Sequence, residues 1–191
     1  MPRSTTMTVA AFAAAAACAL AAPAASQVVS SGGEVVSAAQ KHVVDNLITI
    51  DSIQAATAKL AATKTQNPEI RDFANSLATE HSAHVGALAK IADKKDVGRE
   101  KDAEDKLSAE FAARYSALET TAAGPEFDRA FLQAVVANHQ AEISAIDTWK
   151  ANAKDEDLKK DLGHTTSGLQ SHLSKANELT AKMDKPSKPP F

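Results

Sequence analysis

The chain has 191 residues and a formal net charge of −3, from 21 basic and 24 acidic side chains that are interleaved along the sequence. This length supports one domain with a sizeable core, and the balanced charge argues against nucleic acid as a partner. Only seven Gly, seven Pro and 4% aromatic residues are present. Such a composition favours helices over sheets, so we expect an all-α protein.

The first 26 residues have the pattern of a signal peptide. Arg3 is followed by a charge-free apolar run over residues 9–22 and by small residues up to Ser26. This is the order of a basic region, an apolar region and a cleavage site, so we expect export to the periplasm or cell envelope. A stable membrane anchor is the alternative, but the run is shorter than the ~20 apolar residues that a spanning helix needs.

The only cysteine, Cys18, lies inside this segment. The mature domain is therefore expected to contain neither a thiol nor a disulfide. Ala16, Ala17 and Cys18 also form a degenerate lipoprotein box, in which Ala15 stands where a Leu would be expected. Lipidation of Cys18 is thus a second, less favoured interpretation.

A helical-bundle domain is expected over residues 35–184, between two flanking segments. Residues 27–34 are small and polar and contain two glycines, which indicates a linker, and three prolines in residues 185–191 indicate an extended tail. The first long helix is predicted over residues 35–64. Its inward-facing positions are Val43, Leu47, Ile50, Gln54, Thr57 and Ala61.

A tight turn is predicted after this helix. Asn67 supplies a cap and Pro68 a first-turn proline, so the second helix begins at once and folds back antiparallel on the first. The second helix carries a stripe spaced 3, 4, 4, 3, 4 and 3 residues apart: Ile70, Phe73, Leu77, His81, His84, Leu88 and Ile91. Such a stripe is the inward face of a bundle helix, and two histidines occupy its middle.

A crossover is predicted between the second and third long helices. Residues 93–106 alternate in charge sign, as an exposed connection does, and a connecting helix is predicted over residues 103–121. At ~1.5 Å per residue, its ~19 residues would span most of the length of a bundle. The second and third long helices would then run parallel.

Two more long helices follow, and each has a histidine in its inward stripe. Gly124 and Pro125 begin the third helix, and Asp155 caps the fourth. The third stripe is Phe131, Val135, His139, Glu142, Ile146 and Trp149. The fourth is Leu158, Leu162, Thr165, Leu169, His172, Ala176, Leu179 and Met183.

Counting residues from the turns places the inward histidines at one depth. His81 lies as far beyond the first turn as residues 51–53 lie before it, and His139 pairs in depth with a position within one turn of His172. In parallel helices His81 and His139 also share a level, because they lie 13 and 14 residues after the prolines that start their helices. We therefore expect all four long helices to contribute to one polar layer.

This layer contains imidazole and carboxylate groups, which suit Zn, Cu, Ni or Fe, and no thiolate. The pairs His81 with His84, and His139 with Glu142, are spaced i, i+3, so each pair lies on one helix face. We predict a metal site whose ligands are His81, His84, His139, Glu142 and His172, with Asp51, Gln54 and Glu80 as further candidates. His42 and His164 fall off the layer and are predicted to lie at the surface.

Two interpretations without a metal remain open. In the first, a structural or stress-related protein, the histidines form a hydrogen-bond network in the core. In the second, a histidine and Glu142 act as general acid and base, but no nucleophile, oxyanion motif or cofactor fingerprint accompanies them. No catalytic residue and no small-molecule substrate is therefore assigned, and the sequence leaves the oligomeric state open.

Three motifs occur in order along the chain: residues 67–74 (NPEIRDFA) leading into Glu80-His81, residues 126–131 (EFDRAF) leading into Asn138-His139, and residues 169–173 (LQSHL). Together they resemble a bacterial family of exported ferritin-like proteins that is catalogued as a domain of unknown function and sometimes labelled as outer membrane proteins. The resemblance covers roughly residues 44–179. It implies a ferritin-like four-helix bundle in the cell envelope and no established activity.

The resemblance carries over residues that lie within these motifs: His81, Asp128, Phe131, His139 and His172. Members of the family often have a Glu in the first helix, where this chain offers only Asp51 and Gln54. A di-iron carboxylate site also needs Glu from two helices and Glu-x-x-His from the other two. Histidines outnumber carboxylates in this layer, so we do not expect ferroxidase or oxygenase chemistry.

Overall fold

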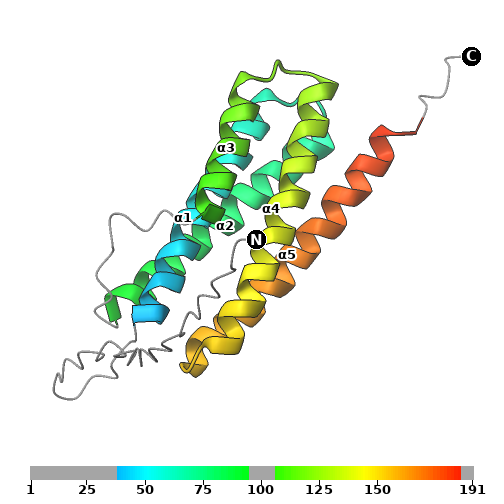
Figure 1. Ribbon diagram of the computed structural model, residues 1–191. Coiled ribbons are helices and arrows are strands. Elements are labelled where there is room, and N and C mark those ends of the chain that lie inside the picture. The colour runs from blue at the N-terminus through cyan, green and yellow to red at the C-terminus, as the bar shows by residue number, and fades with distance from the viewer. Residues whose placement is uncertain (1–37, 95–105, 186–191) are drawn as a thin grey trace, which may run out of the picture. The chain divides into compact units, whose positions relative to one another are not determined.

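Five helices form the part of the chain that the structure, a computed structural model, describes, which is residues 38–94 and 106–185 (Figure 1). No strand occurs within these residues, so the prediction of an all-α protein is confirmed. The helices are α1 (Ala38–Lys64), α2 (Pro68–Lys94), α3 (Lys106–Thr120), α4 (Pro125–Asn152) and α5 (Glu156–Met183).

Local sequence signals set where α2, α4 and α5 begin, through polar caps at α2 and α5 and a glycine at α4. The side-chain Oδ1 of Asn67 accepts hydrogen bonds from the backbone N–H groups of Glu69 and Ile70, at 3.0 and 3.4 Å. Asp155 Oδ1 accepts from the backbone N–H of Leu158 at 2.8 Å. Gly124 precedes α4 at a φ of 136°, which favours glycine. The predicted caps at Asn67 and Asp155 are therefore confirmed.

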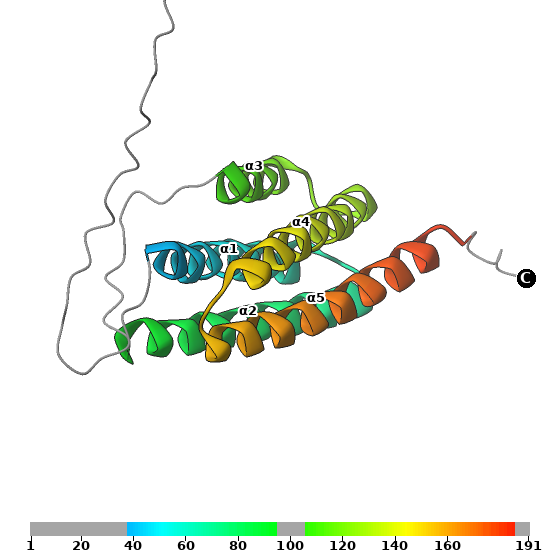
Figure 2. The ribbon, with the colours of Figure 1, turned by 60° about the horizontal axis from the view of Figure 1, so that its bottom comes forward.

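The helices pair as two hairpins. α1 packs along α2, α4 packs along α5, and the hairpins meet through contacts of α1 with α4 and of α2 with α5. Figure 2 shows α1 and α4 in a middle row, α2 and α5 below them, and α3 on the opposite side, where it contacts α1 and α4. The two hairpins therefore pack against each other, and α3 covers α1 and α4.

The contacts of Lys64 show how α3 is directed. The ammonium group of Lys64, at the end of α1, donates to the carbonyl oxygens of Leu118 and Glu119, at 3.1 and 3.0 Å. The same group lies 5.0 Å from the ring centroid of Phe127, in the first turn of α4. The end of α3 and the start of α4 thus both lie at the end of α1, and α2 and α4 run in the same direction.

The buried apolar residues form two clusters, one towards each end of the hairpins. The first contains Ile70, Phe73, Phe127, Phe131 and Leu179, among others. The second contains Leu47, Leu88, Ile146, Leu158 and Leu162, among others. The six buried polar side chains of the predicted layer fall between these two clusters in sequence: Asp51, Gln54, His81, His139, Glu142 and His172. We call the belt that contains them the polar layer.

Most positions predicted to face inwards are buried, with five exceptions in α2, α4 and α5. His84, Ile91, Trp149, Thr165 and Met183 are only half-buried. The predicted signal peptide, linker and tail lie outside the described residues, apart from Lys185. Residues 35–37 and 103–105 of the two predicted helices also lie outside them. Among the described helices, none combines the length and the hydropathy that crossing a membrane requires.

Candidate metal centre

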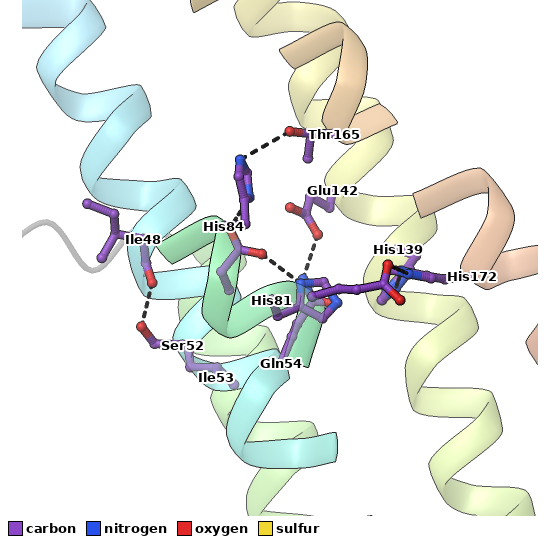
Figure 3. A network of polar contacts seen from close by, with 12 residues as sticks. Ile48, Ser52, Ile53, Gln54, His81, His84, His139, Glu142, Thr165 and His172 are labelled. Carbon is purple, nitrogen blue, oxygen red and sulfur yellow. Dashed lines mark hydrogen bonds and ion pairs between the residues drawn. The ribbon is translucent and has the colours of Figure 1, made fainter. Parts of the chain in front are cut away.

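Three imidazoles from three helices converge in the polar layer. His81 of α2, His139 of α4 and His172 of α5 each place one ring nitrogen within 4.8 Å of the other two. Their ring centroids are 5.2 to 5.5 Å apart, and the residues are 4%, 1% and 9% exposed. We call these residues the three-imidazole cluster; Figure 3 shows all three rings, with those of His139 and His172 side by side.

Asp51 of α1 fixes the orientation of the His81 imidazole through a hydrogen bond. The Nδ1 of His81 lies 2.6 Å from Asp51 Oδ1, and Asp51 is 1% exposed. Burial alone would raise the pKa of Asp51, but hydrogen bonds from His81 and His84 outweigh it and keep that pKa below its usual value. The ionised carboxylate can only accept, so His81 Nδ1 carries the proton. The other nitrogen, His81 Nε2, is buried and has no hydrogen-bond partner.

Glu80 holds His172 in a similar way. Glu80 Oε2 lies 2.9 Å from His172 Nε2, and the hydroxyl of Ser76 donates to Glu80 Oε1 at 2.6 Å. Burial raises the pKa of Glu80, but the bonds from Ser76 and His172 outweigh this and lower it. His172 Nε2 therefore donates its hydrogen to the carboxylate. In the neutral ring, His172 Nδ1 then carries a lone pair.

That lone pair faces His139. The distance from His139 Nε2 to His172 Nδ1 is 3.1 Å, so His139 donates and His172 accepts. Burial lowers the pKa of His139 well below its ordinary value, and the neighbouring His81 and His172 lower it further. Burial also lowers the pKa of His172, against the raising effect of Glu80. Both rings are neutral at pH 7, and His139 Nδ1 is buried without a partner.

His84 lies beside the cluster but faces another way (Figure 3). Its Nδ1 lies 2.7 Å from Asp51 Oδ2, and its Nε2 lies 3.3 Å from both Asp161 Oδ2 and Thr165 Oγ1 of α5. Burial opposes a charge on His84, but the bonds to Asp161 and Asp51 overcome it and raise its pKa to about 10. His84 is therefore an imidazolium at neutral pH, between two carboxylates.

Glu142 is the fully buried carboxyl group of the layer. It accepts a hydrogen bond from Gln54 Nε2 at 2.6 Å, and its Oε1 has no partner. Burial and the nearby negative charge of Asp51 raise the pKa of Glu142 to about 8. The group is therefore protonated at neutral pH, and it lies outside the three-imidazole cluster.

A groove connects this region to the surface. Its volume is about 230 Å³, and it runs between α2 and α5, with Asp51 of α1 at its floor. The lining includes His81 and His172 of the cluster, His84, Asp161 and the exposed His164. A void of about 10 Å³ lies beside His81, His139 and Gln54, which is close to the space that one water molecule needs.

The pairs of residues predicted to share a level do lie together in the structure. His81 contacts Asp51, and His139 contacts His172, as the counting predicts. Of the predicted ligands, His81, His139 and His172 converge, while His84 and Glu142 have other partners; Asp51, Gln54 and Glu80 act as hydrogen-bonding groups around them. His42 and His164 are exposed, as predicted.

Asp161 was not among the predicted site residues. Its signal in the sequence is its spacing of four from Thr165, which was predicted to face inwards and so shares a helix face with it. Ser76, which donates to Glu80, carries the same kind of i, i+4 signal on α2. Asp161 is half-buried and Ser76 is exposed, so neither position belongs to an apolar stripe that would single it out.

Comparison with protein-family models matches residues 23–179 to a family described as "Domain of unknown function (DUF4142)". The match covers most of the chain and includes every residue of the three-imidazole cluster. The expected relationship to a domain of unknown function is therefore confirmed. No curated protein and no solved structure matches the chain.

Proposed function

The chain belongs to the DUF4142 family, and from the geometry of its three-imidazole cluster we propose that it binds a transition-metal ion. The observation that carries this proposal is the convergence of three buried ring nitrogens within 4.8 Å of one another. Storage or buffering of the metal is the role that such a site supports without a catalytic group.

The hydrogen bonds around the cluster support the same proposal. Metal-binding histidines usually donate their second ring N–H to a carboxylate, which fixes the ring and its tautomer. Asp51 does this for His81, and Glu80 does it for His172. His81 Nε2 is buried without a hydrogen-bond partner, and an unpartnered buried polar atom costs about 1–3 kcal/mol of stability. A metal bound at the cluster would give this atom a partner.

The distances require side-chain adjustment and, at His139, a shift of the ring hydrogen from Nε2 to Nδ1 so that Nε2 can bind the ion. Two ligands of a tetrahedral zinc ion, each bonded at about 2.0–2.1 Å, lie about 3.3 Å apart. His139 Nε2 and His172 Nδ1 are already 3.1 Å apart, and the widest gap in the cluster is within 4.8 Å. Rotation of one imidazole about its side-chain bonds would close that gap.

The donor set also indicates which metals would bind. Three imidazole nitrogens suit borderline dications, and affinity for nitrogen donors rises from Fe²⁺ to Cu²⁺ and then falls at Zn²⁺. The ionised Asp51 and Glu80 would offset the charge of a dication. We therefore expect Cu²⁺ and Zn²⁺ to bind more tightly than Fe²⁺.

Calorimetric titration of the purified protein with Zn²⁺, and separately with Cu²⁺, tests this function. One tightly bound ion per chain is expected. At a free concentration of 100 times its Kd the ion should stabilise the fold by about 2.7 kcal/mol, seen as a higher melting temperature. His139→Gln should abolish this tight site. His42→Gln, which changes an exposed imidazole, should leave it intact. Absence of tight binding and of any melting shift would refute the proposal.

A structural role without metal is the second candidate, and one observation favours it. His139, His172 and Glu80 form a continuous chain of hydrogen bonds, and Asp51 joins His81 to His84. Such a network would stabilise contacts between the hairpins in a structural or stress-related protein. His139→Gln should then lower the free energy of unfolding in metal-free protein, and no added metal should change the stability of the wild type.

The fold and location complete the proposal. The two hairpins, with α3 as a crossover between α2 and α4, support a ferritin-like four-helix bundle. The basic residue, apolar run and small residues of the first 26 positions support a signal peptide and a place in the cell envelope. Cell fractionation with an antibody to the bundle would test the location.

A further inference from the structure

A second pair of ligand-type groups lies in the groove beside the three-imidazole cluster. His84 of α2 and Asp161 of α5 face each other there, with Nε2 and Oδ2 3.3 Å apart. The side chains are 19% and 22% exposed, so solvent reaches both. We call them the outer pair.

The distance within the outer pair matches the spacing of two metal ligands. A dication bonded to an imidazole nitrogen at about 2.0–2.1 Å and to a carboxylate oxygen at about 2.0–2.2 Å separates these atoms by about 3.3 Å. Without metal the two atoms form a hydrogen bond that is longer than the ~2.7–2.9 Å usual for a charge-assisted one. The two atoms are therefore spaced to hold an ion between them without movement of either helix.

Asp51 orients His84 as it orients His81. Its Oδ2 lies 2.7 Å from His84 Nδ1, while its Oδ1 lies 2.6 Å from His81 Nδ1. One buried carboxylate thus turns the Nε2 atoms of two histidines in two directions. His81 Nε2 belongs to the buried layer, and His84 Nε2 faces Asp161 in the groove.

The groove carries an excess of negative charge. Asp51, Glu80 and Asp161 all line it, and within the described part of the chain neither Lys nor Arg is among its lining residues. His164, an exposed imidazole, lines the same groove and offers a further nitrogen ligand. Such a lining concentrates cations near the outer pair.

We propose that His84 and Asp161 form a second, outer metal site that binds a borderline dication such as Zn²⁺ in the groove. The site has two protein ligands in place and a third, His164, nearby, and water completes the coordination. Only two protein ligands are in place here, against three at the three-imidazole cluster, so this site is the weaker of the two. It binds an ion independently of that cluster.

Equilibrium dialysis of the purified protein against Zn²⁺ tests the outer site. The wild type is expected to bind one ion tightly and a second ion at least tenfold more weakly. Asp161→Asn should remove the second ion and leave the first. Asp157→Asn, which changes an exposed carboxylate one turn earlier on α5 and outside the groove, is the matched control and should retain both ions.

The fold and the ligand are checked separately. The Asp161→Asn protein should melt cooperatively without metal, and NMR of the wild type should show the ring signals of His84 shifting with the second equivalent of Zn²⁺. If Asp161→Asn retains the second ion, if Asp157→Asn loses it too, or if the signals of His84 do not shift, the outer site is refuted. A single weak ion that depends on Asp161, with no tight ion, would support the outer site and refute the proposed function.

Discussion

The three-imidazole cluster and the outer pair share one carboxylate, Asp51, yet His139 and His172 of the cluster differ in charge from His84 of the outer pair. His139 and His172 are buried against other imidazoles, and burial lowers the pKa of each. His84 lies between Asp51 and Asp161, and these carboxylates raise its pKa to about 10 despite partial burial. The number of carboxylates in contact with a ring, and not its depth alone, therefore decides whether the ring is a neutral ligand or a cation.

Among the proposed variants, Asp51→Asn should cause the largest loss of stability, because both the cluster and the outer pair depend on Asp51. The variant removes the negative charge that His81 and His84 both contact, and it leaves His84 with only Asp161. Breaking a buried ion pair from one side typically costs about 3–5 kcal/mol, so the free energy of unfolding should fall by about that amount. Urea denaturation of metal-free protein measures it, with Asp93→Asn, an exposed carboxyl on α2, as control. A loss below about 1 kcal/mol would show that Asp51 is solvated.

Glu142→Gln should change how the stability of the protein depends on pH. The folded protein binds the proton of Glu142 more tightly than the unfolded chain, because burial raises its pKa from 4.5 to about 8. Its contribution to stability is complete below pH 4.5 and is lost as the pH rises through about 8. Glu142→Gln cannot ionise, so it should exceed the wild type in stability at pH 9 by on the order of 3 kcal/mol.

The same two proteins should be nearly equal at pH 5, where Glu142 is protonated in the folded state. Urea denaturation at several pH values between 5 and 9 gives both curves. Parallel curves for the wild type and Glu142→Gln would mean that Glu142 is ionised throughout this range. The buried layer would then contain an additional negative charge beside Asp51.

Glu80→Gln tests whether the cluster depends on a carboxylate behind His172. The amide oxygen can still accept from His172 Nε2, but the negative charge is lost. Changes to such supporting groups typically lower metal affinity 10- to 100-fold, and we expect about tenfold here. Competition between Zn²⁺ and a chromophoric chelator measures the affinity. Glu178→Gln, another exposed carboxyl of the bundle, should have no effect.

Ser76→Ala should have the smallest effect. Its hydroxyl donates to Glu80 from an exposed position on α2, so its removal should change the free energy of unfolding by less than about 0.5 kcal/mol. The pKa of Glu80 should rise, because Ser76 is the largest of the interactions that lower it. NMR titration of the Glu80 carboxyl carbon would show this rise, and an unchanged pKa would contradict it.

Helix placement was predictable from the sequence because the signals are local. Asn67, Pro68, Gly124, Pro125 and Asp155 each act within one turn of the chain, and all of them mark observed helix starts. Depth also followed from the sequence, since a helix rises by a constant amount per residue. The contact of His81 with Asp51, thirty positions apart, was found in this way.

The protonation states could not be predicted in the same way. They depend on which side chain of a neighbouring helix faces each ring, and this is set by rotation of the helices about their axes. His81 and His84 are consecutive positions of the same predicted stripe, but only His84 lies beside Asp161. The absence of His84 and Glu142 from the three-imidazole cluster has the same cause, because a shared level does not ensure a shared direction.

The polar layer between the two apolar clusters also fixes how the hairpins align lengthwise. Sliding one hairpin along the other by one helical turn would shift the facing side chains by about 5.4 Å. Such a slide would place His139 and His172 of one hairpin opposite apolar side chains of the other, and would separate Glu80 from its partner. A polar belt of this kind specifies register, as a single buried Asn does in a coiled coil. The side chains that would hold an ion therefore also select one lengthwise alignment of the two hairpins.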